Sequence, residues 1–235
     1  MERTIRSSGR YFNHWYSHVI MKVLFFVFIF FTYALIGQTD TTHTFIYNPN
    51  STLKEGIYFS FDRFIKQQPL PFVKVINYES YTDKDAFFKQ KQIQFLDEYG
   101  IVKMVETKNI WGYVLNNALY IYYNKEFYRV SYIGTLTHFI ATQTVRNYTT
   151  PYDPYYGYYA PYPSQTYETT SLIQNIIDFR NGKLYPFTPE AILALISDDS
   201  ELFNEYSLLK KKKKKEMMFY YLRKYNDKHP LILHK

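Results

Sequence analysis

The 235-residue sequence contains no cysteine. No disulfide can therefore form, so the fold has to rest on a hydrophobic core, which a chain of this length is able to bury. Without cysteine the chain also has no thiol nucleophile. Bacterial lipoproteins carry their lipid on a cysteine at the mature N-terminus, so we also expect no lipid anchor.

Motifs typical of catalysis and of cofactor binding are missing as well. No serine lies in a G-x-S-x-G setting, and no P-loop or G-x-G-x-x-G run occurs. The histidines lack metal-ligand spacing, and His138, inside a predicted strand, is expected to be an ordinary hydrogen-bonded sheet residue. Asp198, Asp199 and Glu201 could form a carboxylate pair, but the helix dipole explains acidic residues at a helix start. We therefore expect no catalytic residue, no metal and no cofactor.

The sequence has a single long apolar run, close to its N-terminus. Residues 23–33 are apolar except for Thr32, follow Lys22, and lead through Ala34–Gly37 into a polar stretch. A basic start, a short apolar centre and a small exit residue are typical of a secretory signal, and the run is shorter than the roughly 20 residues of a membrane span. We predict a signal peptide at Met21–Gly37, cleaved between Gly37 and Gln38; an uncleaved anchor is the alternative. The prediction implies a periplasmic or secreted protein with no membrane span after cleavage.

The segments on either side of this signal are interpreted from their composition. Residues 1–20 are basic and show no clear period, and Met21 begins a complete signal. We interpret residues 1–20 as a gene-model extension, with a long basic leader to the signal as the alternative. Residues 38–54 are polar and are predicted to be a tether.

The positive charge of the chain is concentrated in one place. The chain has 28 basic and 21 acidic residues and a formal net charge of +7. A nucleic-acid-binding surface would spread its basic residues along a face, so we expect no nucleic-acid partner. The lysine run is either an electrostatic contact for an acidic lipid, polysaccharide or protein, or a solvated stretch of helix. It consists of Lys210, Lys211, Lys212, Lys213, Lys214 and Lys215.

Residues 55–187 are dominated by patterns typical of β-strands. Short runs of β-branched and aromatic residues alternate with turn-like pairs such as Asn116-Asn117 and Asn124-Lys125, and Asn181-Gly182 is a strong hairpin signal. Connections this short cannot hold crossover helices, so the sheet should be an antiparallel meander. We predict an α+β fold with a curved antiparallel sheet or small barrel. The expected strands are 56–60, 72–78, 93–97, 101–106, 111–115, 118–123, 127–133, 137–145, 171–179 and 183–187.

Helical patterns accompany this sheet. Apolar residues of 61–68 share one helical face, whereas residues 85–91 are ambiguous between helix and loop. Thr188-Pro189-Glu190 supplies an N-cap, a proline at the first position and a carboxylate in the first turn. A second helix is expected from Asp198 to about Tyr225, with the lysine run inside it. Residues 188–235 therefore form a predicted C-terminal helical segment.

Residues 148–167 are rich in tyrosine and proline. Their prolines exclude a central strand or helix, so a long loop is predicted. Tyrosines give amphipathic contact area at low entropic cost, which suits a recognition surface; alternatively they fold back onto the sheet, or the insertion is disordered. The candidate partner-binding residues are Tyr155, Tyr156, Tyr158, Tyr159 and Tyr162.

Several short stretches carry a family resemblance: Glu55–Phe64 with Pro69, Ile110–Tyr113, Phe127–Arg129, Ile133-Gly134, Leu222–Asn226 and His229-Pro230. In these stretches the sequence resembles uncharacterised secreted proteins of Bacteroidetes. The resemblance spans most of residues 55–230, implies a Gram-negative envelope, and carries no activity; Asp40-Thr41-Thr42 is similar to an O-glycosylation signal of that group. We expect an exported, non-enzymatic envelope or secreted protein that binds a protein or glycan, with an envelope glycan or peptide hydrolase as the alternative.

Overall fold

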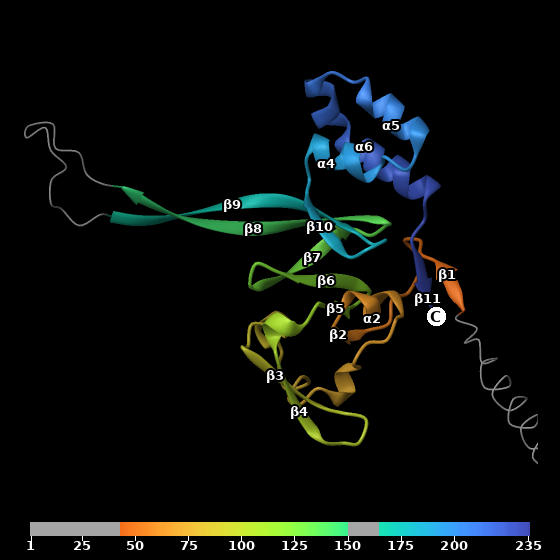
Figure 1. Cartoon of the computed structure of the whole chain (residues 1–235). Helices are drawn as coiled ribbons and strands as arrows, with labels where there is room; N and C mark the ends of the chain where they lie inside the picture. The colour runs from red at the N-terminus through yellow and green to blue at the C-terminus, as the bar shows by residue number, and fades with distance from the viewer. Residues whose placement is uncertain (1–42, 150–164) are drawn as a thin grey trace, which may run out of the picture. The chain divides into compact units, whose positions relative to one another are not determined.

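A seven-stranded antiparallel sheet, curled into a half-barrel, forms the centre of the protein (Figure 1). The computed structural model describes residues 43–149 and 165–235. The strand order β10-β9-β8-β7-β6-β5-β2 makes β5 to β10 a meander, with β2 added beside β5. The predicted α+β class with a curved antiparallel sheet is confirmed. The strands are β2 (Gly56–Tyr58), β5 (Gly112–Leu115), β6 (Ala118–Tyr123), β7 (Glu126–Tyr132), β8 (Leu136–Thr149), β9 (Gln165–Asp178) and β10 (Lys183–Pro186).

Two tight turns set the register of the middle strands. Asn116 and Asn117 connect β5 to β6 and have φ of 51° and 58°. Asn124 and Lys125 connect β6 to β7 with φ of 47° and 75°. Positive φ at both central residues matches the right-handed twist of the flanking strands, so these turns hold neighbouring strands in direct register.

Two smaller sheets accompany the half-barrel. Strands β3 (Gln92–Leu96) and β4 (Val102–Glu106) form a two-stranded sheet of their own, which an isolated bridge joins to Val75, although we expected both strands in the meander. Strand β1 (Thr44–Ile46) pairs with β11 (Ile232–His234). The segment expected to be a polar tether is therefore structured from Thr44 onward, because its apolar residues pack on the core and Leu53 is fully buried.

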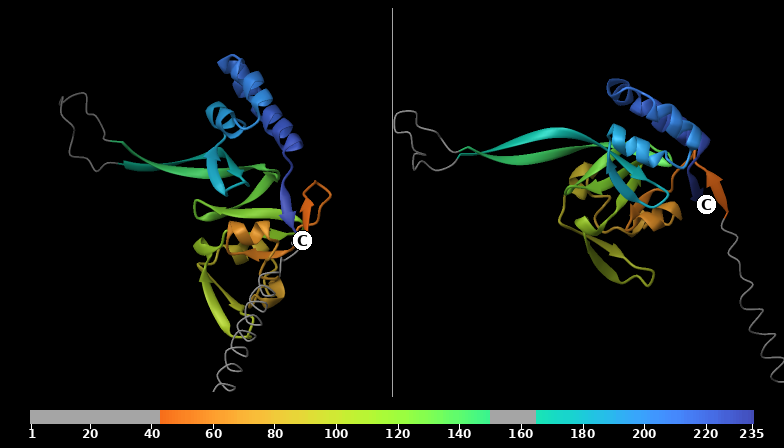
Figure 2. Two further views of the ribbon diagram at one scale, coloured as in Figure 1. Left: turned by 45° about the vertical axis from the view of Figure 1, so that its right-hand side comes forward. Right: turned by 45° about the horizontal axis from the view of Figure 1, so that its top comes forward.

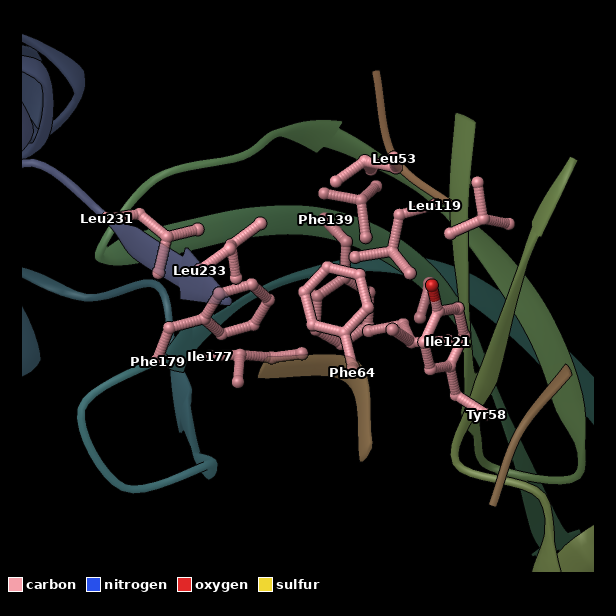
Figure 3. Close-up of a cluster of buried hydrophobic side chains, with 13 residues drawn as sticks. Leu53, Tyr58, Phe64, Leu119, Ile121, Phe139, Ile177, Phe179, Leu231 and Leu233 are labelled. Atoms are coloured by element: carbon pink, nitrogen blue, oxygen red, sulfur yellow. The ribbon is translucent and has the colours of Figure 1, made fainter. Parts of the chain in front are cut away.

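The strands bury side chains on both faces of the sheet. Tyr58 and Val114 point into one core, which Figure 3 shows closed by Leu231 and Leu233 from the C-terminal end. The neighbouring residues Ile57 and Tyr113 point into a second core. Alternation along β2 and β5 therefore places side chains in two separate clusters. We call the second one the α3 core, because it contains Phe87 and Phe88 of helix α3 (Lys84–Phe88). The α3 core consists of Ile57, Leu70, Val75, Tyr78, Phe87, Phe88, Ile93, Ile110 and Tyr113.

Short helices with side-chain caps connect the strands. Ser60 accepts a hydrogen bond from the Arg63 amide at the start of α2, as the predicted helix over 61–68 requires. Thr188 caps α4 by accepting from the Ala191 amide, which confirms the predicted cap. Residues 85–91, ambiguous in sequence, begin within a helix, α3. The helical elements are α2 (Phe61–Ile65), η1 (Phe72–Lys74), α3 (Lys84–Phe88), η2 (Thr107–Asn109), α4 (Pro189–Leu195), α5 (Ser200–Ser207) and α6 (Lys211–Lys228).

The C-terminal helices α4 to α6 pack together on β8 and β9 (Figure 2). Asn226 of α6 joins them to the sheet, since its side chain bonds both the amide and the carbonyl of Leu136, at 2.7 and 2.9 Å. Within residues 43–149 and 165–235, no helix combines the length and the apolar character that crossing a membrane requires.

Two further predicted elements differ from the structure. Residues 72–78 are a 3-10 helix followed by turns, because Pro71 precedes them and Asn77 adopts a positive φ of 61°. Within this segment, only Val75 makes an isolated strand bridge. The helix predicted from Asp198 to Tyr225 is two helices, α5 and α6. The break lies at Leu208–Lys210, where Lys210 is extended, so the lysine run starts α6 instead of interrupting a helix.

The β8–β9 hairpin is longer than its sequence pattern indicates. Its strands pair in unbroken register to Thr149 and Gln165, so both ends of the predicted loop 148–167 are strand. The candidate tyrosines of that loop lie outside the described residues.

Candidate functional site

A cavity of about 690 Å³ is lined by residues of α3, η2 and strands β5 to β7. Concave sites that combine aromatic walls with a few polar groups are the usual places where proteins bind small ligands. We call this cavity the aromatic pocket. Its floor is built from Phe88, Tyr113, Tyr120, Tyr122 and Phe127.

The alternation of strand β6 directs its tyrosines into the pocket. Leu119 and Ile121 are buried in the sheet core, so Tyr120 and Tyr122 lie on the opposite face. Tyr120 stands directly across from Tyr113 of β5, and Tyr122 across from Phe127 of β7. Three adjacent strands thus place four aromatic side chains on one continuous face.

The rings of the floor are stacked in a column. Phe88 and Tyr113 are parallel with centroids 3.6 Å apart, and Tyr113 and Tyr120 are parallel at 4.6 Å. Phe127 meets Tyr113 edge-on at 5.0 Å. Phe88 and Tyr113 are buried, and burial raises the pKa of the Tyr113 hydroxyl. Tyr120, at the end of the column, is only half-buried and lines the cavity.

Helix α3 supplies one wall and fixes the rim beside it. Asp83 caps the helix by accepting from the Asp85 amide at 2.9 Å, while Phe87 and Phe88 anchor it in the α3 core. After the helix, Lys91 accepts a bond at its carbonyl from the Thr107 amide at 2.9 Å, and the Thr107 hydroxyl donates to the Gln90 carbonyl. The rim segment 89–91 is therefore held against η2.

Charged side chains of both signs surround the aromatic floor. The lysines are Lys89, Lys91, Lys108 and Lys125, and the carboxylates are Asp85, Glu106 and Glu126. Lys108 Nζ lies 2.6 Å from Glu106 Oε2, and the hydrogen bond to Glu106 raises the Lys108 pKa. A rim of this kind offers donors and acceptors side by side, which is what a ligand rich in hydroxyl groups needs.

The lysine run predicted as an electrostatic contact lies at the start of α6. Lys210 is the N-cap residue and makes no capping bond, and Lys211–Lys215 form the first turns. Lys213 pairs with Glu216 at 3.4 Å, and Lys214 Nζ lies 5.9 Å from the Tyr206 ring centroid. The other members of the run are exposed. None of these lysines lines the aromatic pocket.

The carboxylates at the predicted helix start are bound in structural contacts. Asp199 caps α5 through the Leu202 amide at 3.0 Å and pairs with Lys228 at 2.7 Å, and Lys228 also pairs with Glu201. The bond from Lys228 and the cap bond lower the Asp199 pKa. The interpretation of these acids as helix-start residues is confirmed.

Asp198 belongs to a second polar cluster, centred on Arg180. The guanidinium forms two bonds to Asp178 at 2.8 and 2.9 Å, and one each to Asp198 and the Tyr225 hydroxyl at 2.6 Å. A further bond, at 3.0 Å, goes to the Leu195 carbonyl. These contacts tie the β9–β10 turn to α4 and α6, and we call the cluster the arginine joint.

His138 is a buried sheet residue, as predicted, but only one of its nitrogens has a partner. Its Nε2 lies 3.1 Å from Gln174 Oε1, and Nδ1 has no partner among the described residues. Phe187 and Phe219 pack edge-on against the ring at 4.9 and 4.7 Å. Burial lowers the His138 pKa. Across residues 43–149 and 165–235, no group of three or more potential metal ligands comes together.

The chain matches no protein-family model, no curated protein and no solved structure. The aromatic pocket therefore has to be interpreted from its own chemistry. The sequence predictions did not include it, although the alternation Leu119-Tyr120-Ile121-Tyr122 was a visible signal that tyrosines share one strand face. What the sequence did not reveal is that α3 covers only part of that face.

Proposed function

We propose that this protein is an exported, non-enzymatic binding protein that holds a glycan in the aromatic pocket. The observation that carries the proposal is the stacked column Phe88–Tyr113–Tyr120, which ends in a half-exposed ring inside a cavity with a mixed polar rim. The C–H face of a sugar ring is apolar and packs well on the face of an aromatic ring. A sugar placed on Tyr120 would continue the column.

The rim supports a glycan in preference to an apolar ligand. Sugar hydroxyls both donate and accept hydrogen bonds, and the pocket presents ammonium groups, carboxylates and the Gln90 amide around the floor. An apolar ligand would make no use of these groups. A glycan is also one of the two partner classes that the sequence predicts.

The state of the lining carboxylates supports binding in preference to hydrolysis. A glycosidase needs a general acid shielded from cations and a second carboxylate at a defined separation. Glu106 is instead paired with Lys108, and its side chain is 45% exposed. Glycan hydrolysis is the alternative function, and the binding experiment also tests for it.

Export is proposed from the sequence pattern at Met21–Gly37. Its test is cell fractionation with mass spectrometry of the mature N-terminus. A periplasmic or secreted species that begins at Gln38 is the expected result. An intact N-terminus in the inner membrane would instead establish the anchor alternative.

The binding proposal is tested with an array of envelope and extracellular polysaccharides, followed by calorimetry on each positive glycan. Tyr120→Ala should lose at least tenfold in affinity, because the sugar loses its stacking surface. Tyr99→Ala is the matched control, since Tyr99 is 87% exposed and lies outside the pocket. No binding to any glycan, or equal losses in both variants, would overturn the proposal. Appearance of new reducing ends during incubation would favour a hydrolase.

A further inference from the structure

The charges on the pocket rim do not cancel. Glu106 forms an ion pair with Lys108. By contrast, Lys89, Lys91 and Lys125 form no ion pair with any residue that the structure describes. Two lining carboxylates remain, Asp85 and Glu126. Three ammonium groups against two carboxylates leave a surplus of one positive charge.

Of the two remaining carboxylates, Glu126 has a local contact and Asp85 lies at a helix start. Glu126 Oε2 accepts a bond from the Tyr128 hydroxyl at 3.1 Å, and Tyr128 in turn lies 2.6 Å from the Thr142 hydroxyl of β8. Asp85 lies in the first turn of α3, where the helix dipole favours a negative charge. Among the residues that the structure describes, none makes a comparable contact with the three lysine side chains, so their charge is available to a ligand.

Lys125 occupies a backbone position that does not favour a lysine. It is the second residue of the tight β6–β7 turn, with φ of 75°. Glycine or asparagine is the usual residue there, because the Cβ of any other residue is crowded in the left-handed region. When a residue that lines a site has a strained backbone, the strain indicates a functional role for its side chain. Lys125 lines the aromatic pocket.

From these observations we infer that the ligand is an acidic glycan in which the sugar bound in the pocket carries one negative charge. The inference rests on the proposed glycan-binding function and names the class of glycan. A ring stacks on Tyr120, and its uronate carboxylate or sulfate ester is neutralised by Lys89, Lys91 and Lys125. One such group matches the surplus charge of the rim. Lysine ammonium groups act as point charges and accept either anion without a fixed bidentate geometry.

The experiment compares acidic polysaccharides with the same chains after the charge has been removed. Polygalacturonate, polymannuronate and hyaluronan are paired with their carboxyl-reduced forms, and carrageenan is paired with its desulfated form. We expect at least one acidic member to bind tenfold or more tightly than its neutral partner at 50 mM salt. This advantage should shrink at 0.5 M salt, where screening is stronger. The uronate and sulfate pairs distinguish the two anions.

Protein variants show whether the lysines are responsible. The triple variant Lys89→Gln, Lys91→Gln, Lys125→Gln should remove the preference for the acidic chain and leave affinity for the neutral partner within about twofold. Lys108→Gln is the matched control, because Lys108 is already paired with Glu106. It should reduce the preference less than the triple variant does.

The Lys125→Gly variant measures two things separately: the contribution of the Lys125 side chain to ligand binding, and the cost in stability of its backbone conformation. Glycine relieves the backbone strain, so Tm should rise by about 2 °C, while affinity for the acidic chain falls about threefold. Asn124→Gly, in the same turn with the charge retained, should leave that affinity unchanged. A Lys125→Gly variant that binds the acidic chain like the wild type would remove Lys125 from the site.

The possible failures are distinguishable. Equal binding of charged and neutral partners would overturn the acidic-glycan inference and leave the proposed glycan binding intact. Binding of neutral array glycans alone would have the same meaning. Absence of binding to every charged and neutral glycan would overturn both.

Discussion

The arginine joint and the aromatic pocket are built from similar side chains but differ in how those side chains are satisfied. In the joint, Arg180 bonds to Asp178, Asp198, Tyr225 and a backbone carbonyl, so its donors are used within the protein. In the pocket, only Lys108 of the four lining lysines has a carboxylate partner within residues 43–149 and 165–235. The comparison indicates that polar groups which bond to one another stabilise the fold. Polar groups around the aromatic floor that lack such a partner are available to a ligand.

Side-chain exposure also distinguishes the arginine joint from the aromatic pocket. Asp178 is 2% exposed and is neutralised by two bonds from Arg180, and burial with a partner is the arrangement that structural ion pairs need. The joint fastens the turn after β9 to the helices that follow it. Removing one partner from the joint should therefore affect stability, and removing a residue from the pocket should affect binding.

The largest expected effect is on the joint. Arg180→Ala leaves the Asp178 carboxylate buried without its cation, and we expect a loss of about 3 kcal/mol in the free energy of unfolding, at the low end for buried pairs because Arg180 is partly exposed. Urea denaturation measures the loss. Arg146→Ala is the control, since the Arg146–Glu168 pair is solvent-exposed and should contribute less than about 1 kcal/mol. Similar losses in both variants would contradict the structural role of the joint.

The next effect concerns the pocket and uses the hydroxyl of Tyr120. Tyr120→Phe keeps the ring and its stack on Tyr113, so glycan affinity should stay within about threefold of the wild type, the range of one net hydrogen bond. Tyr120→Ala removes the ring and should lose at least tenfold. Calorimetry on the best array glycan checks both. If Tyr120→Phe lost as much as Tyr120→Ala, the hydroxyl would be the essential group and stacking would not explain the site.

Much of the fold could be predicted from local patterns. The alternation in β6, the Asn-Asn turn and the Thr188 cap are short-range signals, and the structure contains each of them. The β1–β11 pair was not predictable, because its two strands are far apart in the sequence. The β3–β4 hairpin is local and both of its strands were expected, but its separation from the meander was not predictable, because the sequence does not show that β2 is the strand that lies beside β5. The break before α6 was also missed, since six lysines have good helix propensity and Lys210 gives no local stop signal.

The candidate site illustrates the same limit. Sequence analysis singled out clusters of one residue type, the loop tyrosines and the lysine run. The aromatic pocket instead combines Phe88, Tyr120 and Lys125 from separate segments, and no window of the sequence contains them together. Its individual signals, a tyrosine on alternating positions and a lysine in a turn, are each too common to indicate a site.

A smaller stability effect concerns the uncapped start of α6. Lys210 has the extended backbone of an N-cap residue but no side chain that accepts a hydrogen bond, and lysines follow at the positive end of the helix dipole. Lys210→Ser should raise stability by about 1 kcal/mol relative to Lys210→Ala. Both variants remove the same charge, so chemical denaturation of the two isolates the cap. Equal stabilities would show that the first turn of α6 needs no cap.

The smallest expected effect is the pH dependence contributed by His138. Burial lowers its pKa in the folded state, so below the ordinary value of 6.5 the unfolded chain binds the additional proton more readily. This contribution to stability is complete above pH 6.5 and decreases as the pH falls below it. Thermal melts between pH 7.5 and 5 should show a steeper loss for the wild type than for His138→Gln. Parallel curves would exclude His138 as a source of the pH dependence.

Amide chemical-shift mapping by ¹H–¹⁵N NMR during titration with the best-binding glycan tests the central claim most directly. The account predicts that the shift changes concentrate at residues 85–91, 106–108 and 120–127, around the aromatic pocket, while the amides of the arginine joint stay in place. Changes centred on residues 178–181 and 195–198, or on the lysine run of α6 with an unchanged pocket, would contradict it.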